Sequence, residues 1–176
     1  MLQVRSVAVS DWQEYRDVRL RALLDSPDAF GSTYEAEVVR TDEQWQARIA
    51  AASISGRDRV LFAMYHERLC GLTWCKLSAS VPDEADLFQM WVDPASRGTG
   101  AGRALLEESL AWARNTGARR VRLGVTAADS PAMRLYTAHG FRPVGSLEPL
   151  RDGSCLLMQE MVFELEPGPS AYCQAT

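Results

Sequence analysis

Apolar positions recur along the chain with two different periods, and each period predicts one kind of element. Short runs rich in β-branched and aromatic residues predict strands over residues 2–7, 60–65, 69–77, 87–92, 119–125 and 156–163, with another around Gly145. Apolar residues spaced by three and four predict helices over residues 12–26, 43–53, 99–115 and 131–138. Residues 28–39 are expected to be a loop.

Capping residues support these boundaries. Ser10 or Asp11 precedes the first predicted helix, and Thr41 or Asp42 precedes the second. Gly117 follows the third, where a glycine commonly ends a helix. Local chemistry therefore marks the same helix ends as the periodicity does.

The order of the elements restricts the topology. Three strands follow one another between residues 60 and 92, which predicts an antiparallel meander with a hairpin at residues 66–68. The strand–helix–strand order over residues 87–125 predicts parallel pairing through a right-handed crossover. We therefore expect a single α/β domain (mixed α+β), with a central, mixed but mostly antiparallel twisted sheet of about 6–7 strands flanked by about 4 helices.

Length and composition fit one domain. The chain has 176 residues, of which 47% are hydrophobic and 24% charged. We expect the domain to span residues 1–165 and residues 166–176 to form a flexible tail. No apolar run approaches the roughly 18 residues of a membrane helix, and no signal peptide is visible, so a cytoplasmic protein without a membrane partner is expected.

The charge is unevenly distributed. The formal net charge is -4, but residues 94–142 contain eight arginines and only three acidic residues. One basic segment in an acidic protein indicates a local anion site rather than a nucleic-acid surface, so no nucleic-acid partner is expected. Chance clustering of solvated charges is the alternative.

The four cysteines, at positions 70, 75, 155 and 173, show no C-x-x-C spacing, and the chain has only two histidines. This pattern matches no zinc site, so no metal is expected and the thiols are interpreted as reduced and structural.

A glycine-rich turn carries the strongest chemical signal. Between the last strand of the predicted meander and the helix that follows, the chain reads DPASRGTGAGR, in which Arg97 and Arg103 flank Gly98, Gly100 and Gly102. Glycines let the backbone approach a ligand closely, and the first turn of a helix presents unpaired N–H groups at its positive end. These features predict a phosphate site, and a tight turn without a ligand is the alternative.

Neither common nucleotide fingerprint fits this turn. A P-loop has a lysine after its last glycine, and the dinucleotide fingerprint has a glycine where this chain has Arg103. The dinucleotide fingerprint also follows the first strand of a βαβ unit rather than a meander.

Two motifs of the chain are specific enough to compare with a known family. The first is Met90-x-Val92-x-x-x-x-Arg97-x-x-Gly100-x-Gly102, which is similar to [V/I]-x-[V/I]-x-x-x-x-[Q/R]-x-x-G-x-[G/A] of the GNAT superfamily of acetyl-CoA-dependent N-acetyltransferases. Residues 129–141, DSPAMRLYTAHGF, are similar to N-x-x-A-x-x-L-Y-x-x-x-G-F. The resemblance covers roughly residues 2–164 in element order, and residues 19–37 are similar to a subgroup of bacterial members. The motifs are specific for the superfamily but not for a substrate.

The resemblance implies acetyl-CoA as the cosubstrate. The residues implied to contact it are Met90, Trp91, Val92, Arg97, Gly98, Thr99, Gly100, Ala101, Gly102, Arg103, Asp129, Ser130 and Tyr136. Amides of the glycine-rich turn would hold the diphosphate, and the strand before it would pair with the pantetheine arm. Tyr136 would protonate the departing thiolate, with a packed helix tyrosine as the alternative. Asp129 stands where the family usually has Asn; it either accepts from pantetheine amides or caps the helix that starts at Pro131.

Acetyl transfer also needs a neutral amine, so a base or a water must accept a proton. Asp86, before the third meander strand, and Glu35, in the early loop that covers the acceptor site in similar proteins, are the candidate bases. Gln89 occupies a strand position that is often acidic in similar proteins. A water held by backbone carbonyls is the alternative to a dedicated base.

Three aromatic residues, Phe30, Tyr34 and Trp91, are candidates for the walls of the acceptor pocket, and a role in the core is their alternative. The resemblance thus implies an enzyme that transfers the acetyl group of acetyl-CoA to a primary amine of a small molecule, peptide or protein. The alternative is a non-catalytic acyl-CoA-binding sensor, which would use the same glycine-rich turn. A homodimer formed through the last strands is compatible with either.

Overall fold

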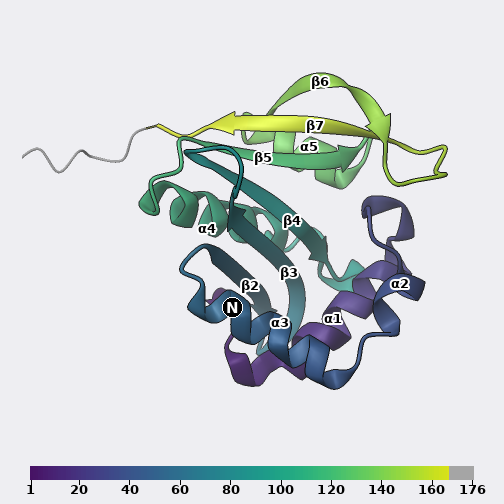
Figure 1. The fold of residues 1–176 in the computed structure, drawn as a ribbon, viewed down its shortest axis with the longest axis vertical. Helices are drawn as coiled ribbons and strands as arrows, with labels where there is room; N and C mark the ends of the chain where they lie inside the picture. The colour runs from purple at the N-terminus through teal and green to yellow at the C-terminus, as the bar shows by residue number, and fades with distance from the viewer. Residues whose placement is uncertain (167–176) are drawn as a thin grey trace, which may run out of the picture.

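The computed structural model describes residues 1–166 as one seven-stranded sheet with helices on both faces (Figure 1). The strands are β1 Leu2–Ser6, β2 Asp58–Tyr65, β3 Arg68–Leu77, β4 Glu84–Val92, β5 Arg120–Thr126, β6 Arg142–Pro149 and β7 Leu157–Glu164. The helices are α1 Trp12–Asp25, α2 Tyr34–Val38, α3 Asp42–Ile54, α4 Ala101–Asn115 and α5 Pro131–Ala138. Beyond Glu166, the expected tail and Cys173 lie outside the described residues.

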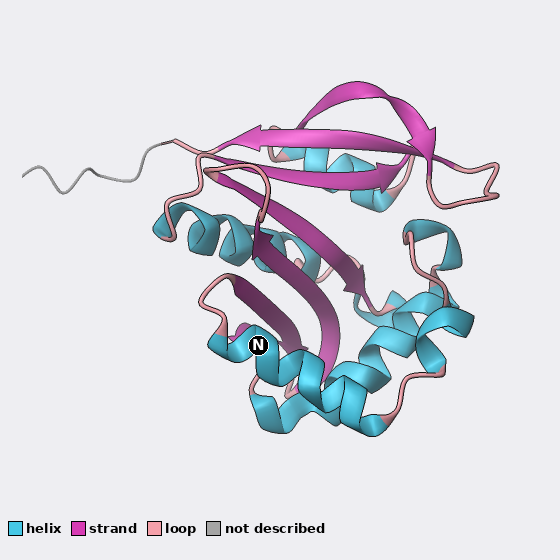
Figure 2. Cartoon of the chain, in the orientation of Figure 1, coloured by secondary structure: helices cyan, strands magenta, loops and turns pink. Residues whose placement is uncertain are grey.

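The sheet order is β1-β2-β3-β4-β5-β7-β6. β2, β3 and β4 form the predicted antiparallel meander, and β4 and β5 form a parallel pair joined through α4. The other neighbouring strands pair antiparallel, so the predicted fold class is confirmed (Figure 2). Within residues 1–166, no helix is long and apolar enough to cross a membrane.

The helix count differs from the expectation at one place. The predicted loop over residues 28–39 contains α2, so the structure has five α-helices where about four were expected. Thr33 caps this helix, since its hydroxyl accepts from the Ala36 N–H at 3.2 Å. The only buried residue of α2 is Glu37, and a five-residue helix without an apolar stripe gives no periodic signal.

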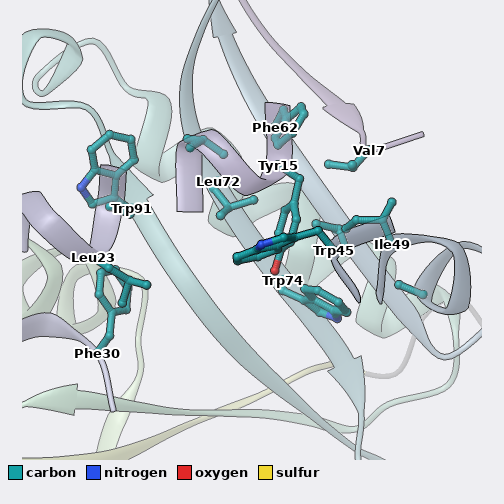
Figure 3. Close-up of a cluster of buried hydrophobic side chains, with 14 residues drawn as sticks. Val7, Tyr15, Leu23, Phe30, Trp45, Ile49, Phe62, Leu72, Trp74 and Trp91 are labelled. Atoms are coloured by element: carbon teal, nitrogen blue, oxygen red, sulfur yellow. The ribbon is translucent and has the colours of Figure 1, made fainter. Parts of the chain in front are cut away.

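Aromatic packing fills one face of the sheet. α1 and α3 cover β2 and β3 there, and Tyr15 meets Trp45 and Trp74 edge to face, with ring centroids 5.8 Å apart in both pairs (Figure 3). On the opposite face, α4 buries Leu106 and Leu110 in a cluster that also includes β5 and α5. The sheet therefore separates two hydrophobic cores, one on each face.

β4 and β5 stay together over a short distance only. They pair from Glu84–Arg120 to Asp86–Arg122, and beyond that point they diverge (Figure 1). The second half of β4 therefore has a paired strand on its β3 side alone. The turn that follows β4 and the helices α4 and α5 lie beside this divergence.

Candidate active site

The glycine-rich turn connects β4 to α4. A short 3-10 helix, Pro94–Ser96, is capped by Asp93, whose Oδ1 accepts from the Ala95 N–H at 3.0 Å. Gly98 and Gly100 follow with φ of 82° and 89°, in the left-handed region that favours glycine. A side chain at either glycine would strain the turn.

Free backbone N–H groups gather where α4 begins. Within residues 1–166, the amides that donate to no protein oxygen here are those of Gly98, Gly100, Ala101, Gly102 and Arg103. The amides of Arg97 and Thr99 make long internal bonds of 3.4 Å instead. Donors at the positive end of a helix dipole can bind an anion such as phosphate.

The two arginines that flank the glycines are both held by acidic side chains. Arg97 Nη2 donates to Asp25 Oδ2 at 2.7 Å, and its Nε donates to the Val92 carbonyl at 3.2 Å. Arg103 Nε donates to Glu107, one turn along α4, at 2.7 Å. The backbone therefore adds free donors to the N–H groups that remain unused on these two guanidinium groups.

β4 has a β-bulge at Gln89, which the sequence does not signal with a glycine. Between Phe88 and Trp91, two residues of β4 face a single residue of β3, Thr73, and Gln89 takes φ of 57°. Because β4 has already left β5 here, the backbone of residues 90–92 is open on its β5 side. An extended ligand could pair with it as an added strand.

A polar chain fixes the side chain of Gln89. The Tyr15 hydroxyl accepts from Arg48 Nε at 3.3 Å and donates to Gln89 Oε1 at 3.0 Å. Arginine only donates, so the tyrosine proton must point to Gln89. An amide side chain is not a base at neutral pH, so Gln89 does not accept the proton of the amine.

Tyr136 lies on α5, next to the start of α4. A Cβ at Gly102 would lie 3.4 Å from Leu135 Cδ2, which shows that the two helices meet beside the turn. Tyr136 is 5% exposed and packs against Phe141, with ring centroids 5.7 Å apart. Burial raises the pKa of the Tyr136 phenol well above its ordinary value, so the hydroxyl is protonated at neutral pH.

The helix cap at the start of α5 differs from the expectation. Ser130, and not Asp129, is the N-cap, and its hydroxyl accepts from the Met133 N–H at 3.1 Å. Asp129 is exposed and accepts from Arg134 at 2.7 and 3.2 Å. The capping role expected for Asp129 is therefore wrong, because the residue next to the helix supplies the closer oxygen.

The two candidate bases lie on different elements. Asp86 is in the last pair that β4 makes with β5, and its carboxylate accepts from Arg122 Nε at 3.2 Å. Arg122 also contacts the buried Glu84, whose carboxylate is 3.1 Å from Nη2. Glu35 is exposed on α2. Asp86 is therefore an ion-paired carboxylate at the point where β4 and β5 diverge, whereas Glu35 is an exposed carboxylate on the short helix α2.

The segment between α1 and α3, residues 26–40, is tied down by residues far away in sequence. Thr126 Oγ1, at the end of β5, donates to the Asp28 carbonyl at 2.5 Å. Arg151 Nη1, in the β6–β7 connection, donates to the carbonyls of Pro27 at 3.1 Å and Phe30 at 2.9 Å. Residues 26–40, named the α1–α2 segment below, therefore lie against the end of the sheet where β4 and β5 have diverged.

A buried ion pair anchors the same segment to α1. Arg19 donates to both carboxylate oxygens of Glu37, at 2.8 and 3.2 Å, and its guanidinium lies 4.8 Å from the centre of the Phe30 ring. Both charged side chains are less than 5% exposed. Neither residue is distinguished in the sequence, because the pairing depends on how α1 and α2 cross.

Two of the three expected pocket walls are core residues. Phe30 and Trp91 are 8% and 4% exposed and belong, with Leu23, to the aromatic core beneath α1 (Figure 3). Tyr34 is partly buried and packs against the same cluster. Among residues 1–166, no group of three or more His, Cys, Asp or Glu side chains could hold a metal ion.

Known proteins resemble this chain in sequence. Residues 18–141 match the Acetyltransferase (GNAT) family. The mycothiol acetyltransferase of Beutenbergia cavernae is 32% identical over 126 residues, which cover 70% of this chain and 39% of that protein. The chain thus spans about two fifths of the length of this curated relative.

Solved structures share the fold. An acetyltransferase of the GNAT family from Streptococcus pneumoniae matches with a TM-score of 0.82 at 22% identity, over 94% of this chain and 100% of that one. The yncA protein of Salmonella typhimurium, solved with its cofactor acetyl-CoA, matches with a TM-score of 0.77 at 19% identity, over 96% of each chain. Since the family match spans most of the chain and includes the glycine-rich turn and Tyr136, the chain belongs to the GNAT family of acetyltransferases.

Proposed function

We propose that this protein transfers the acetyl group of acetyl-CoA to a primary amine of a small molecule, peptide or protein. The observation that carries the proposal is the set of free amides at Gly98, Gly100, Ala101, Gly102 and Arg103. Free donors at one helix end fit the diphosphate of coenzyme A, and they need no metal ion to do so. We name residues 93–103, which contain these donors, the coenzyme turn.

The contacts proposed for the coenzyme follow from this fit. The free amides of the coenzyme turn hold the diphosphate. The backbone of Met90, Trp91 and Val92, open on its β5 side, binds the pantetheine arm as an added strand. Asp129 and Ser130 lie at the start of α5, and Asp129 can only accept hydrogen bonds when ionised. The yncA structure, which holds acetyl-CoA in the same fold, supports acetyl-CoA as the ligand of this fold.

Tyr136 is the proposed general acid. When bound, acetyl-CoA supplies the acetyl group as a thioester, whose C–S bond breaks as the new C–N bond forms. The phenol of Tyr136 donates its proton to the sulfur that leaves, and solvent then returns a proton to the phenolate. Burial raises the pKa of Tyr136, so the phenol is protonated at neutral pH but is a weaker acid than a free tyrosine, and packing against Phe141 limits the movement of the ring.

The amine must lose one proton during the same reaction. We propose Asp86 as its acceptor, directly or through a water, because this carboxylate lies where β4 and β5 begin to diverge. Its bond to Arg122 keeps one oxygen occupied and leaves the other able to accept. Glu35 is the second candidate. It lies on α2, shortly after Asp28, whose carbonyl is bonded to Thr126 at the end of β5.

The class of acceptor rests on the same features. The coenzyme turn lies in the basic part of the chain, and most acidic residues lie outside it. An acidic surrounding favours a cationic amine. The similarity to mycothiol acetyltransferases is consistent with an amine acceptor, over the part of those proteins that this chain matches.

Thiol release from acetyl-CoA across a panel of small and peptide amines tests the proposal. Turnover with at least one amine, strongly reduced in Tyr136→Phe, is expected. Tight coenzyme A binding without turnover on any amine would instead favour the acyl-CoA sensor. No binding of coenzyme A at all would refute both functions.

A further inference from the structure

We propose that Asp25 is a positioning residue of the coenzyme site, which holds the coenzyme turn in place through Arg97 and Trp91. Coenzyme A binding then depends on a carboxylate whose charge opposes that of the ligand. The inference rests on the proposed function, because it takes coenzyme A as the ligand of the turn.

Three donors converge on one oxygen of Asp25, the last residue of α1. Its Oδ2 accepts from Arg97 Nη2 at 2.7 Å, from Trp91 Nε1 at 2.9 Å and from Ser26 Oγ at 2.7 Å. Trp91 is on β4, and Arg97 is in the middle of the coenzyme turn. A single carboxylate therefore joins α1, β4 and the turn.

Further contacts of Arg97 and Arg21 connect the same three elements. Arg97 Nε donates to the Val92 carbonyl at 3.2 Å, so its guanidinium bridges β4 and α1. Arg21, one turn before Asp25, lies 5.3 Å from the centre of the Trp91 ring and 3.5 Å from Asp93. Asp93 and Arg97, which lie before Gly98, are thus both attached to α1. These contacts fix the position of the free amides that follow relative to α1.

The negative charge of Asp25 allows its positioning role to be distinguished from a direct electrostatic effect on the ligand. Burial acts to raise its pKa, but the bonds from Trp91 and Ser26 and the charge of Arg97 hold that pKa below the ordinary value. Asp25 is therefore ionised at neutral pH, and it contacts Arg97 in the turn that is proposed to bind the diphosphate. A nearby like charge weakens anion binding through space. Electrostatics alone predicts that removal of Asp25 tightens binding, whereas positioning predicts that it weakens binding.

Calorimetric titration of the protein with coenzyme A separates the two. We expect Asp25→Ala to bind about ten-fold more weakly than the unchanged protein, because charge-assisted hydrogen bonds to the turn are lost. Asp25→Asn, which keeps an oxygen for Trp91 but not the charge for Arg97, is expected to lie between them. Glu107→Gln is the matched control, since it removes a carboxylate near the start of α4 whose ion-pair partners within residues 1–166 are Arg103 and His139; its affinity is expected to be unchanged or slightly higher.

A double-mutant cycle identifies the route. In an Arg97→Ala background, Asp25→Ala should lose most of its effect, because its main partner is already absent. Thermal unfolding of each variant shows whether it is folded, and Arg97→Ala tests the link from the turn without altering α1. The proposal is overturned if Asp25→Ala or Asp25→Asn binds coenzyme A as tightly as the unchanged protein or more tightly, or if its effect is undiminished in the Arg97→Ala background. If the unchanged protein binds no coenzyme A, the proposed function itself fails.

Discussion

The coenzyme turn and the α1–α2 segment lie at the same end of the sheet, yet they are built in opposite ways. The turn gathers its donors from the backbone of neighbouring residues, with glycines at the positions of positive φ. The α1–α2 segment depends on side chains that are remote in sequence. Thr126 lies 98 residues from the Asp28 carbonyl that it binds, and Arg151 lies 121 residues from the Phe30 carbonyl.

This difference corresponds to the two substrates of the proposed acetyl transfer. Every acetyl-CoA molecule has the same diphosphate, which backbone amides can bind without donating a specific side chain to it. Acceptors differ between enzymes, and loops attached by a few side chains can change without disturbing the core. We therefore expect changes in the turn to affect coenzyme binding and changes in the α1–α2 segment to affect stability and acceptor binding.

The largest effect is expected for Gly100→Val. A β-branched residue does not adopt the φ of 89° found at Gly100, so the turn must change shape and its free amides must move. We expect coenzyme A affinity to fall by about 1,000-fold, or about 4 kcal/mol, in calorimetric titration. Circular dichroism should show native secondary structure, because among the described residues an added Cβ would meet only Leu2 within 4 Å.

Gly102→Ala is the matched control for this change. An added Cβ at Gly102 would make ordinary contacts of 3.4 Å with Leu135 and 3.6 Å with Val92. Its coenzyme affinity should remain within about three-fold of the unchanged protein, well under 1 kcal/mol. Equal affinities of the Gly100 variant and this control would show that the turn is not the coenzyme site.

Glu37→Ala should have the next largest effect, on stability rather than on coenzyme binding. It leaves the buried guanidinium of Arg19 without its two-point partner. Removal of one member of a buried ion pair costs about 3 kcal/mol, which urea unfolding would measure. Glu35→Ala, an exposed change on the same short helix, should alter the free energy of unfolding by less than about 0.5 kcal/mol.

The same pair predicts a pH dependence. Burial acts to raise the pKa of Glu37, but the hydrogen bonds and charge of Arg19 lower it below its ordinary value of 4.5. Its contribution to stability is then fully present above pH 4.5 and is lost as the pH falls through the lowered pKa. The stability gap between the unchanged protein and Glu37→Gln should therefore shrink below that pH. A gap that stays constant down to acid unfolding would argue against the ion pair.

The comparison also explains what the sequence could predict. The meander, the crossover and the cap at Thr41 depend on periodicity and neighbouring residues, and the structure contains all three. The free donors of the coenzyme turn are equally local. By contrast, α2 has no apolar stripe, and the bulge at Gln89 falls on a residue that gives no signal of positive φ.

The remaining interactions could not be read from the sequence because each joins distant segments. Asp25 and Arg97 are 72 residues apart, and Tyr15 and Gln89 are 74 residues apart. The expectation for Asp129 failed for a local reason, since two adjacent residues could both cap α5 and the sequence does not rank their geometry. Pairing across the chain depends on the packing of the helices, which local patterns do not specify.

Tyr136→Phe tests the chemistry that the coenzyme turn serves. The change removes one oxygen from a buried ring and leaves its packing on Phe141 intact. We expect kcat to fall about 100-fold, which is within the usual range for loss of a general acid, while coenzyme A affinity stays the same. A fall in affinity with unchanged kcat would assign Tyr136 to binding instead of catalysis.

Arg151→Ala should give the smallest effect and the most direct test of the division between the two regions. Its loss removes the hydrogen bonds to the Pro27 and Phe30 carbonyls and leaves the bond from Thr126, so the α1–α2 segment loosens without being released. On the proposal that the acceptor binds beside this segment, the acceptor must then order it, and we expect the KM for the amine to rise about five-fold, or about 1 kcal/mol. Coenzyme A affinity should not change, because no contact of Arg151 reaches the coenzyme turn among the described residues. If coenzyme affinity falls together with amine binding, the two regions act as one unit, and the link from the end of α1 through Asp25 to Arg97 is the connection that would carry the effect.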